Sequence, residues 1–195
     1  MARRIAFNYT QALDRATTLF WQHGYTETGL RELLKTMEIG EGSFYNTLKS
    51  KKHLYLSCVE HYGETVVRRR LEALAQAATA AEGIRAFFRV SLDCLDAPDT
   101  PSRLCLVAAM VSEQVLAEPE LRECVQGELE KVRGIFLARL EQDRERGLLP
   151  ASLDPQVTAA IITTYLQGFW RMALVGYDRS AFERQIDSFL SAMGL

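Results

Sequence analysis

Apolar side chains recur every three or four residues along most of the chain, which is the spacing of amphipathic α-helices. No segment alternates apolar and polar residues with the period of two that indicates a β-strand. Glycine and proline separate the helical patterns, most clearly at Gly24, in the loop of residues 96–101 and between Gly147 and Pro150. The pattern therefore predicts an all-α protein of about nine helices.

Near the N-terminus, two short helical patterns flank a tight connection. Thr28 occupies the N-cap position of the first, and Met37 and Ile39 are expected to fill the corner before the second. The second helix, residues 41–48, contains Phe44, which we expect to be buried. Two short helices joined by a tight turn are typical of a helix-turn-helix, so DNA binding is the leading functional hypothesis.

This segment also carries side chains suited to DNA. Short or planar hydrogen-bonding groups fit the major groove, while lysines and helix N-termini bind phosphates. Gly42 would let the helix approach the duplex closely, and Arg31 would reach a phosphate or a base. The predicted DNA contacts are Thr28, Arg31, Gly42, Ser43, Tyr45, Asn46, Lys49 and Lys51. The alternative, in which the lysines form a solvated face, remains open at this point.

Charge is distributed unevenly along the chain. The whole chain carries a net charge of −2, but residues 1–55 carry +3 and the remainder carries −5. A basic head on an acidic body suits a small nucleic-acid module attached to a larger domain, although chance asymmetry explains the same numbers.

No motif points to catalysis, a cofactor or a metal. The chain has no HExxH, no glycine-rich phosphate loop and no nucleophile elbow, so we expect neither an enzyme nor a bound cofactor. Its four cysteines form no CxxC pair and its three histidines are scattered, which argues against a metal site and a disulfide framework. Arg3 and Arg4 precede too short an apolar run for a secretory signal, and the apolar window 159–176 is interrupted by polar residues. We expect a cytoplasmic protein without a membrane span.

The head resembles the tetracycline-repressor family of bacterial transcription regulators. That family has a Gly-aromatic pair followed by a capping Thr, matched by Gly24-Tyr25 and Thr28. Its recognition stretch Lys-Gly-Thr-Leu-Tyr corresponds to residues 41–45, and its Phe-x-Ser-Lys-x-x-Leu segment to residues 48–54. Glu41 and Leu48 depart from the pattern, which leaves the affinity for DNA and the choice of site in question.

The resemblance implies a three-helix DNA-binding domain in residues 1–50 and a helical ligand-binding and dimerisation domain in residues 51–195. A homodimer would bind a near-palindromic double-stranded operator, most simply as a repressor, and a small-molecule effector would release it. The helices 154–175 and 179–193 are the expected dimer interface, although ordinary core packing explains their apolar residues equally well. The residues expected to line the effector pocket are Phe87, Phe88, Cys105, Met110 and Phe136.

Cys105 is the most specific of these candidates. Residues 104–107 and 112–113 resemble a subgroup that controls reductases for reactive electrophiles, in which a cysteine here is a sensing thiol. With Ser102 as the N-cap of a helix 104–116, Cys105 would lie in the first turn, where the helix dipole and Arg103 stabilise a thiolate. An inert buried thiol is the alternative. Cys94, across the same loop, is a possible neighbour, while Cys58 and Cys124 are expected to fill the core.

Two other functions remain to be weighed. The first is an all-helical small-molecule-binding protein or enzyme that retains a vestigial DNA-binding head. The second is a helical adaptor that binds protein alone, for which Glu41 is the hint because its charge opposes DNA.

Overall fold

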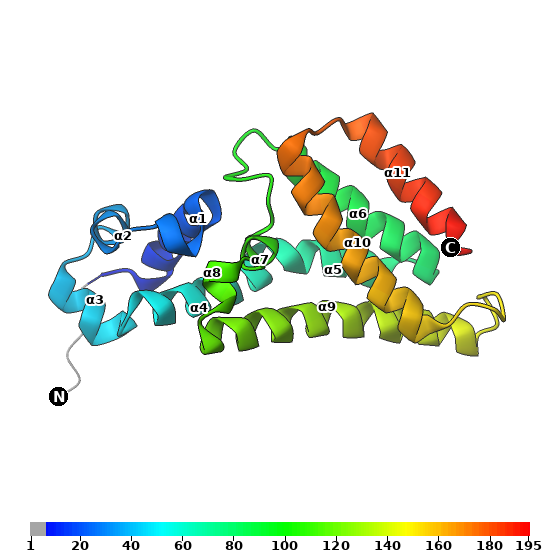
Figure 1. The fold of residues 1–195 in the computed structure, drawn as a ribbon, viewed down its shortest axis with the longest axis horizontal. Coiled ribbons are helices and arrows are strands. Elements are labelled where there is room, and N and C mark those ends of the chain that lie inside the picture. The colour runs from blue at the N-terminus through cyan, green and yellow to red at the C-terminus, as the bar shows by residue number, and fades with distance from the viewer. Residues whose placement is uncertain (1–6) are drawn as a thin grey trace. The chain divides into compact units, whose positions relative to one another are not determined.

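The computed structural model describes residues 7–195, so Arg3 and Arg4, used above for the charge balance and the signal segment, lie outside the described part. The described residues contain eleven α-helices, one π-helical turn and no strands, which confirms the all-α prediction. The helices, drawn in Figure 1, are α1 (Tyr9–Glu27), α2 (Leu30–Met37), α3 (Glu41–Leu48), α4 (Lys51–Tyr62), η1 (Gly63–Val67), α5 (Arg68–Gln76), α6 (Ala80–Asp96), α7 (Leu106–Ala109), α8 (Glu113–Leu116), α9 (Pro119–Glu145), α10 (Pro155–Val175) and α11 (Arg179–Ala192). In this part of the chain, no helix has the length and apolarity that crossing a bilayer requires.

Two predicted helices are each divided in the structure, which accounts for the larger number. The helix expected to run from Ser50 to Leu74 is interrupted by the π-helical turn η1. The helix expected over residues 104–116 is replaced by the two four-residue helices α7 and α8, because Ser112 leaves helical geometry and caps α8 through the N–H of Val115. Gly63 begins η1, whereas no glycine or proline lies between residues 104 and 116 to indicate the second break.

The chain forms two compact units. Unit 1 comprises Met1–Thr65 and Cys105–Val125, and unit 2 comprises Val66–Leu104 and Gln126–Leu195. These units divide the chain differently from the predicted boundary after residue 50, which concerns function and stays a prediction.

In unit 1, helix α1 is the central element. It packs against α2, α4, α7 and α8. Phe20 from α1 meets the ring of Tyr55 from α4 edge-on at 4.8 Å, and both are almost completely buried. Phe44 and Leu48 bury the inner face of α3, as expected for Phe44. Leu48 therefore fills the anchoring position where the resembled family has an aromatic residue.

Gly24 divides α1 into two helical segments at a kink, as the prediction that a helix ends at this glycine requires. Its φ of 77° and ψ of 175° fall in a region that is essentially restricted to glycine, and one further turn reaches Glu27. The turn is closed by Thr28, whose hydroxyl donates a hydrogen bond to the carbonyl of Gly24 at 2.6 Å. Thr28 is fully buried, and the N-cap of α2 is Gly29. The assignment of Thr28 as the N-cap is thus wrong, because its hydroxyl binds backwards along the chain.

In unit 2, α5 and α6 pack closely side by side, and α6 also contacts α11. Gly83 permits the approach of α5 to α6, since a Cβ there would lie 2.5 Å from the carbonyl oxygen of Leu74. Aromatic rings fill the interior: Phe87 meets Phe136 of α9 at 5.2 Å, and Phe88 meets Phe169 of α10 at 5.5 Å.

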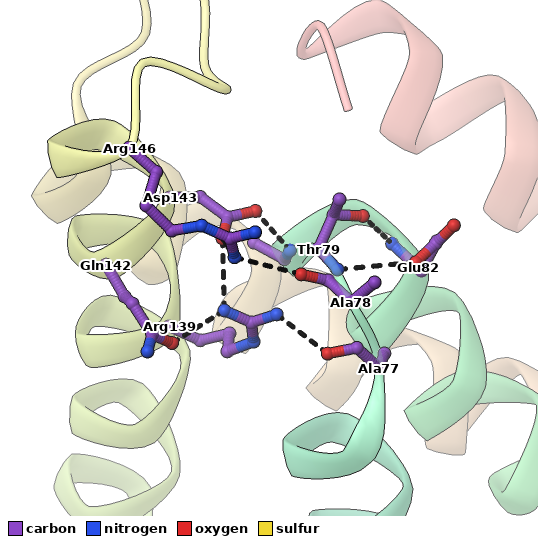
Figure 2. A network of polar contacts seen from close by, with 9 residues as sticks. Ala77, Ala78, Thr79, Glu82, Arg139, Gln142, Asp143 and Arg146 are labelled. Atoms are coloured by element: carbon purple, nitrogen blue, oxygen red, sulfur yellow. Dashed lines mark hydrogen bonds and ion pairs between the residues drawn. The ribbon is translucent and has the colours of Figure 1, made fainter.

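A buried carboxylate ties α9 to the turn between α5 and α6 (Figure 2). Asp143 accepts hydrogen bonds from the N–H of Ala80 at 2.5 Å and from Arg139 at 3.0 Å, and Arg146 lies 3.3 Å away. The two arginines also donate to the carbonyls of Ala77 and Ala78. We call Asp143, Arg139, Arg146 and the backbone they bind the Asp143 cluster. It places a negative charge at the N-terminus of α6, where the helix dipole favours one.

Candidate functional site

Helix α3 separates a buried face from an exposed one. Phe44 is fully buried, whereas the adjacent Tyr45 is 49% exposed and packs its ring edge-on against Phe44 at 5.3 Å. Asn46 is exposed and Ser43 is half-buried. The hydrogen-bonding groups predicted to contact bases are therefore accessible to a partner, while the buried Phe44 holds α3 against the rest of unit 1.

The start of α3 is open. Its N-cap is Gly40, which has no side chain to satisfy the first N–H groups of the helix. At the exposed Gly42, an added Cβ would meet no atom within 4 Å, so a partner can approach the backbone there. Glu41 lies in the first turn, where its negative charge interacts favourably with the helix dipole. This gives Glu41 a structural role in the free protein, although its charge opposes a phosphate.

The two predicted phosphate-binding lysines differ in their surroundings. Lys49 is exposed and ends α3 with a φ of 62°. The Lys51 ammonium lies 4.6 Å from the centre of the Tyr25 ring and 3.5 Å from the carbonyl oxygen of Thr26. Burial lowers the pKa of Lys51, with a smaller opposing effect from Glu27. Lys51 is thus held in place before any partner arrives.

The remaining predicted contacts lie on α2 and before it. Arg31 is exposed in the first turn of α2 and stays a predicted DNA contact. The N-terminal N–H groups of α2, which we expected at Thr28, lie instead in the turn that follows Gly29, and their binding of phosphate stays a prediction.

Lys52 has two acidic partners that the sequence did not predict. This residue follows Lys51 in the first turn of α4, and its ammonium lies 2.8 Å from a carboxylate oxygen of Glu120 and 3.7 Å from one of Glu118. The hydrogen bond to Glu120 raises the pKa of Lys52. The two acids lie 66 and 68 positions away in sequence, so no local spacing could have predicted the pairing.

The predicted effector-binding residues are all buried, but they divide between the units. Phe87, Phe88 and Phe136 belong to the aromatic interior of unit 2. Cys105 and Met110 belong to unit 1. Whether these residues line an effector pocket stays a prediction.

The position expected for Cys105 is wrong. It is the N-cap of α7 and lies outside the first turn, and α7 has only four residues, so the aligned dipoles that would stabilise a thiolate are few. Arg103 stacks on the ring of Tyr177 at 5.6 Å. Ser102 accepts a hydrogen bond from the N–H of Leu104 without starting a helix. Cys105 remains a free thiol, 7% exposed.

The other cysteines have distinct environments. None of the four forms a disulfide bond in the part of the chain that the structure describes. Cys58 is fully buried, and burial raises the pKa of its thiol to about 12, which fits a core-filling role. Cys124 is half-buried. In unit 2, the hydroxyl of Thr100 donates to the carbonyl of Cys94. Within residues 7–195 there is no group of three or more His, Cys, Asp or Glu that could hold a metal ion.

An apolar surface runs along α10 and α11 in unit 2. Tyr165 of α10 stacks on Phe189 of α11 with ring centres 3.8 Å apart. A shallow groove beside this pair is lined by Val157, Ala160, Ile161, Thr164, Tyr165 and Phe189. Val157 is 54% exposed and Ile161 is 43% exposed. Such a patch on a small protein indicates an interface.

Two family models match the chain. Residues 12–58 match the model described as bacterial regulatory proteins of the tetR family, and residues 80–189 match that of the tetracyclin repressor-like C-terminal domain.

Among curated proteins, an uncharacterised HTH-type transcriptional regulator of Bacillus subtilis, YezE, is 26% identical over 194 residues, which cover 99% of this chain and 100% of YezE. The Escherichia coli HTH-type transcriptional repressor NemR is 28% identical over 144 residues, covering 72% of this chain and 71% of NemR.

Among solved structures, a cysteine mutant of the TetR family transcriptional regulator CifR, complexed with 26-base-pair operator DNA, superposes with a TM-score of 0.87. It is 28% identical, over 97% of this chain and 99% of CifR. The reduced form of E. coli NemR has a TM-score of 0.82 at 24% identity, over 94% and 95% of the two chains, and shares the fold.

Proposed function

Because this chain belongs to the TetR family of bacterial regulatory proteins, we propose that it is a transcriptional repressor that binds operator DNA and leaves it when an effector binds. One observation carries the proposal: α3 exposes Tyr45 and Asn46 while Phe44 anchors it from behind. The protein would act on DNA in the cytoplasm, and the proposal assigns it no catalytic step.

Helix α3 is the recognition helix. Ser43, Tyr45 and Asn46 present hydroxyl and amide groups to base edges in the major groove, and Gly42 admits the duplex close to the backbone. Lys49 and Lys51 contact phosphates on either side of the short turn into α4, and Arg31 does so from α2. Tyr25 orients Lys51 for this contact, which lowers the entropy lost on binding.

A homodimer places two recognition helices on a near-palindromic operator. One module reads few base pairs, so specific binding needs a second copy. The apolar surface of α10 and α11 is the proposed interface, because Val157 and Ile161 are exposed in the single chain. A two-fold contact between two copies of the α10–α11 pair would cover both.

The effector must bind the DNA-competent and DNA-released states with unequal affinity, since equal affinity shifts nothing. Its proposed binding residues are Phe87, Phe88, Cys105, Met110 and Phe136. A reactive electrophile is the proposed class, because Cys105 is a free thiol in the segment that resembles electrophile sensors.

Selection from a library of randomised duplexes tests DNA binding directly. The wild-type protein is expected to enrich a near-palindrome and to bind it with a steep dependence on salt. Tyr45→Ala should weaken binding to that duplex by roughly tenfold to a hundredfold, since a base contact contributes about 1–3 kcal/mol. Gln22→Ala, an exposed change on α1, is the control and should leave affinity unchanged. Failure to enrich any sequence would overturn the proposal.

The electrophile hypothesis has its own test. N-ethylmaleimide should release wild-type protein from the selected duplex, and Cys105→Ser should abolish that release. Cys124→Ser is the matched control, because Cys124 is also a cysteine of unit 1 that forms no disulfide bond. Unchanged release from the Cys105→Ser protein would refute the sensor role while leaving DNA binding intact.

A further inference from the structure

The contact of Lys52 with Glu118 and Glu120 has a consequence for DNA recognition. We propose that these two carboxylates bind Lys52 in place of a DNA phosphate. They would thereby prevent Lys52 from contacting the DNA backbone and lower the sequence-independent affinity of the protein for DNA. This inference rests on the proposed function, because it concerns how that interface discriminates among duplexes.

The geometry is that of an ammonium held by two acids. The Lys52 nitrogen lies 2.8 Å from Glu120 and 3.7 Å from Glu118, within hydrogen-bonding and ion-pair distance respectively. The lysine side chain is 28% exposed, whereas the acids are 50% and 61% exposed. Both acids lie at the junction of α8 and α9, and all three residues belong to unit 1.

Lys52 lies next to Lys51, a proposed phosphate contact, at the start of α4. Ser50 caps α4 by accepting a hydrogen bond from the N–H of His53, so Lys51 and Lys52 are the first two residues of that helix. Lys51 is a proposed phosphate contact, and an unpaired lysine at the next position would add a second positive charge beside it. Glu118 and Glu120 counter that charge, and they also contribute to raising the pKa of Tyr25, after burial.

The expected effect is on selectivity. Phosphate contacts strengthen binding to every sequence alike, and each one adds about 0.9 to the magnitude of the salt slope of log K. A lysine occupied by carboxylates makes no such contribution. Because binding to random DNA depends almost entirely on these contacts, losing one weakens non-specific binding and preserves base readout.

The test is the double variant Glu118→Gln/Glu120→Gln, measured by fluorescence anisotropy on the selected duplex and on a shuffled duplex of equal length over a series of NaCl concentrations. On the shuffled duplex, we expect roughly two- to fivefold tighter binding at low salt, the equivalent of an exposed ion pair of about 0.4–1 kcal/mol. The salt slope should steepen by about 0.9. The ratio of selected to shuffled affinity should fall.

Two controls separate the release of Lys52 from a general change in charge. Glu113→Gln/Glu123→Gln removes the same charge from other exposed acids of unit 1 and should change the slope little. Adding Lys52→Gln to the first double variant should restore the wild-type slope. A slope equal to that of the charge control, or one that Lys52→Gln does not reverse, would overturn the inference. In either case, continued selection of a near-palindrome by the wild type would leave the proposed function standing.

Discussion

Two charge clusters, the Lys52 contact in unit 1 and the Asp143 cluster in unit 2, use the same chemistry in opposite surroundings. Lys52 meets two acids that are at least half exposed. Asp143 is 1% exposed and Arg139 is 10% exposed, and between them they bind two groups of the backbone, the N–H of Ala80 and the carbonyl of Ala77. An exposed pair exchanges readily with water, salt or DNA, whereas a buried one must remain paired.

Burial determines which charges contribute to folding and which remain available for binding. Removing one partner of a buried pair leaves an unpaired charge in a medium of low dielectric constant, which destabilises the folded state. Removing a partner of an exposed pair leaves a charge that water solvates. We therefore expect the buried Asp143 cluster to contribute to the stability of unit 2, and the exposed Lys52 contact of unit 1 to contribute little to stability.

The largest expected effect is that of Asp143→Ala. It removes the acceptor for the N–H of Ala80 and the carboxylate beside the buried Arg139. We expect the free energy of unfolding to fall by about 3–5 kcal/mol, measured by urea denaturation followed by circular dichroism.

Asp143→Asn separates charge from hydrogen bonding, because its amide oxygen can still accept from Ala80. Its loss should be smaller than that of Asp143→Ala. A loss below about 1 kcal/mol for Asp143→Ala would contradict the structural role of the cluster, since it is the size expected of an exposed pair.

The second largest effect is expected at Gly24 in unit 1. At a φ of 77° and ψ of 175°, any residue with a Cβ is strained, and Gly24→Ala should cost about 1–3 kcal/mol. No atom lies within 4 Å of the added Cβ, so the cost is that of the backbone alone. Gly42→Ala, in the helical conformation of α3, is the control and should not destabilise the protein. Equal stability of both variants in urea would argue against strain at Gly24.

The sequence predicted the helical architecture well because apolar periodicity reports which face of each helix is buried. Phe44 and Leu48 lie four positions apart and both are buried, while Tyr45 and Asn46 between them are exposed. The proposed recognition surface could therefore be recognised from its spacing and from the family resemblance.

The remaining features depend on contacts that local patterns do not encode. A threonine before a helix can accept from the next turn or donate to the previous one, and Thr28 does the latter because Gly24 leaves its carbonyl within reach. Ser112 was expected to continue a helix but caps a new one, and Cys105 is an N-cap because α7 begins only at Leu106. The pairing of Lys52 with Glu120 could not be predicted from the sequence, because the two residues lie 68 positions apart and only the fold brings them together.

A smaller effect is expected at Ser50, which caps α4. Its hydroxyl oxygen accepts from the N–H of His53 at 3.1 Å, and Ser50→Ala should lower stability by about 1 kcal/mol. Thermal unfolding measures the change, and Ser50→Asn should recover most of it because Asn is an equally good N-cap. If Ser50→Asn is no more stable than Ser50→Ala, the cap contributes little.

The smallest effect is expected at an exposed pair of α9. Arg133 donates two hydrogen bonds to Glu130, three positions away, at 2.9 and 2.5 Å, and Glu130 is 64% exposed. The hydrogen bond from Arg133 lowers the pKa of Glu130. Despite this favourable geometry, Arg133→Gln should leave the free energy of unfolding almost unchanged, because water solvates the released carboxylate. A loss in urea comparable to that of Asp143→Ala would show that burial is not what distinguishes the two kinds of ion pair.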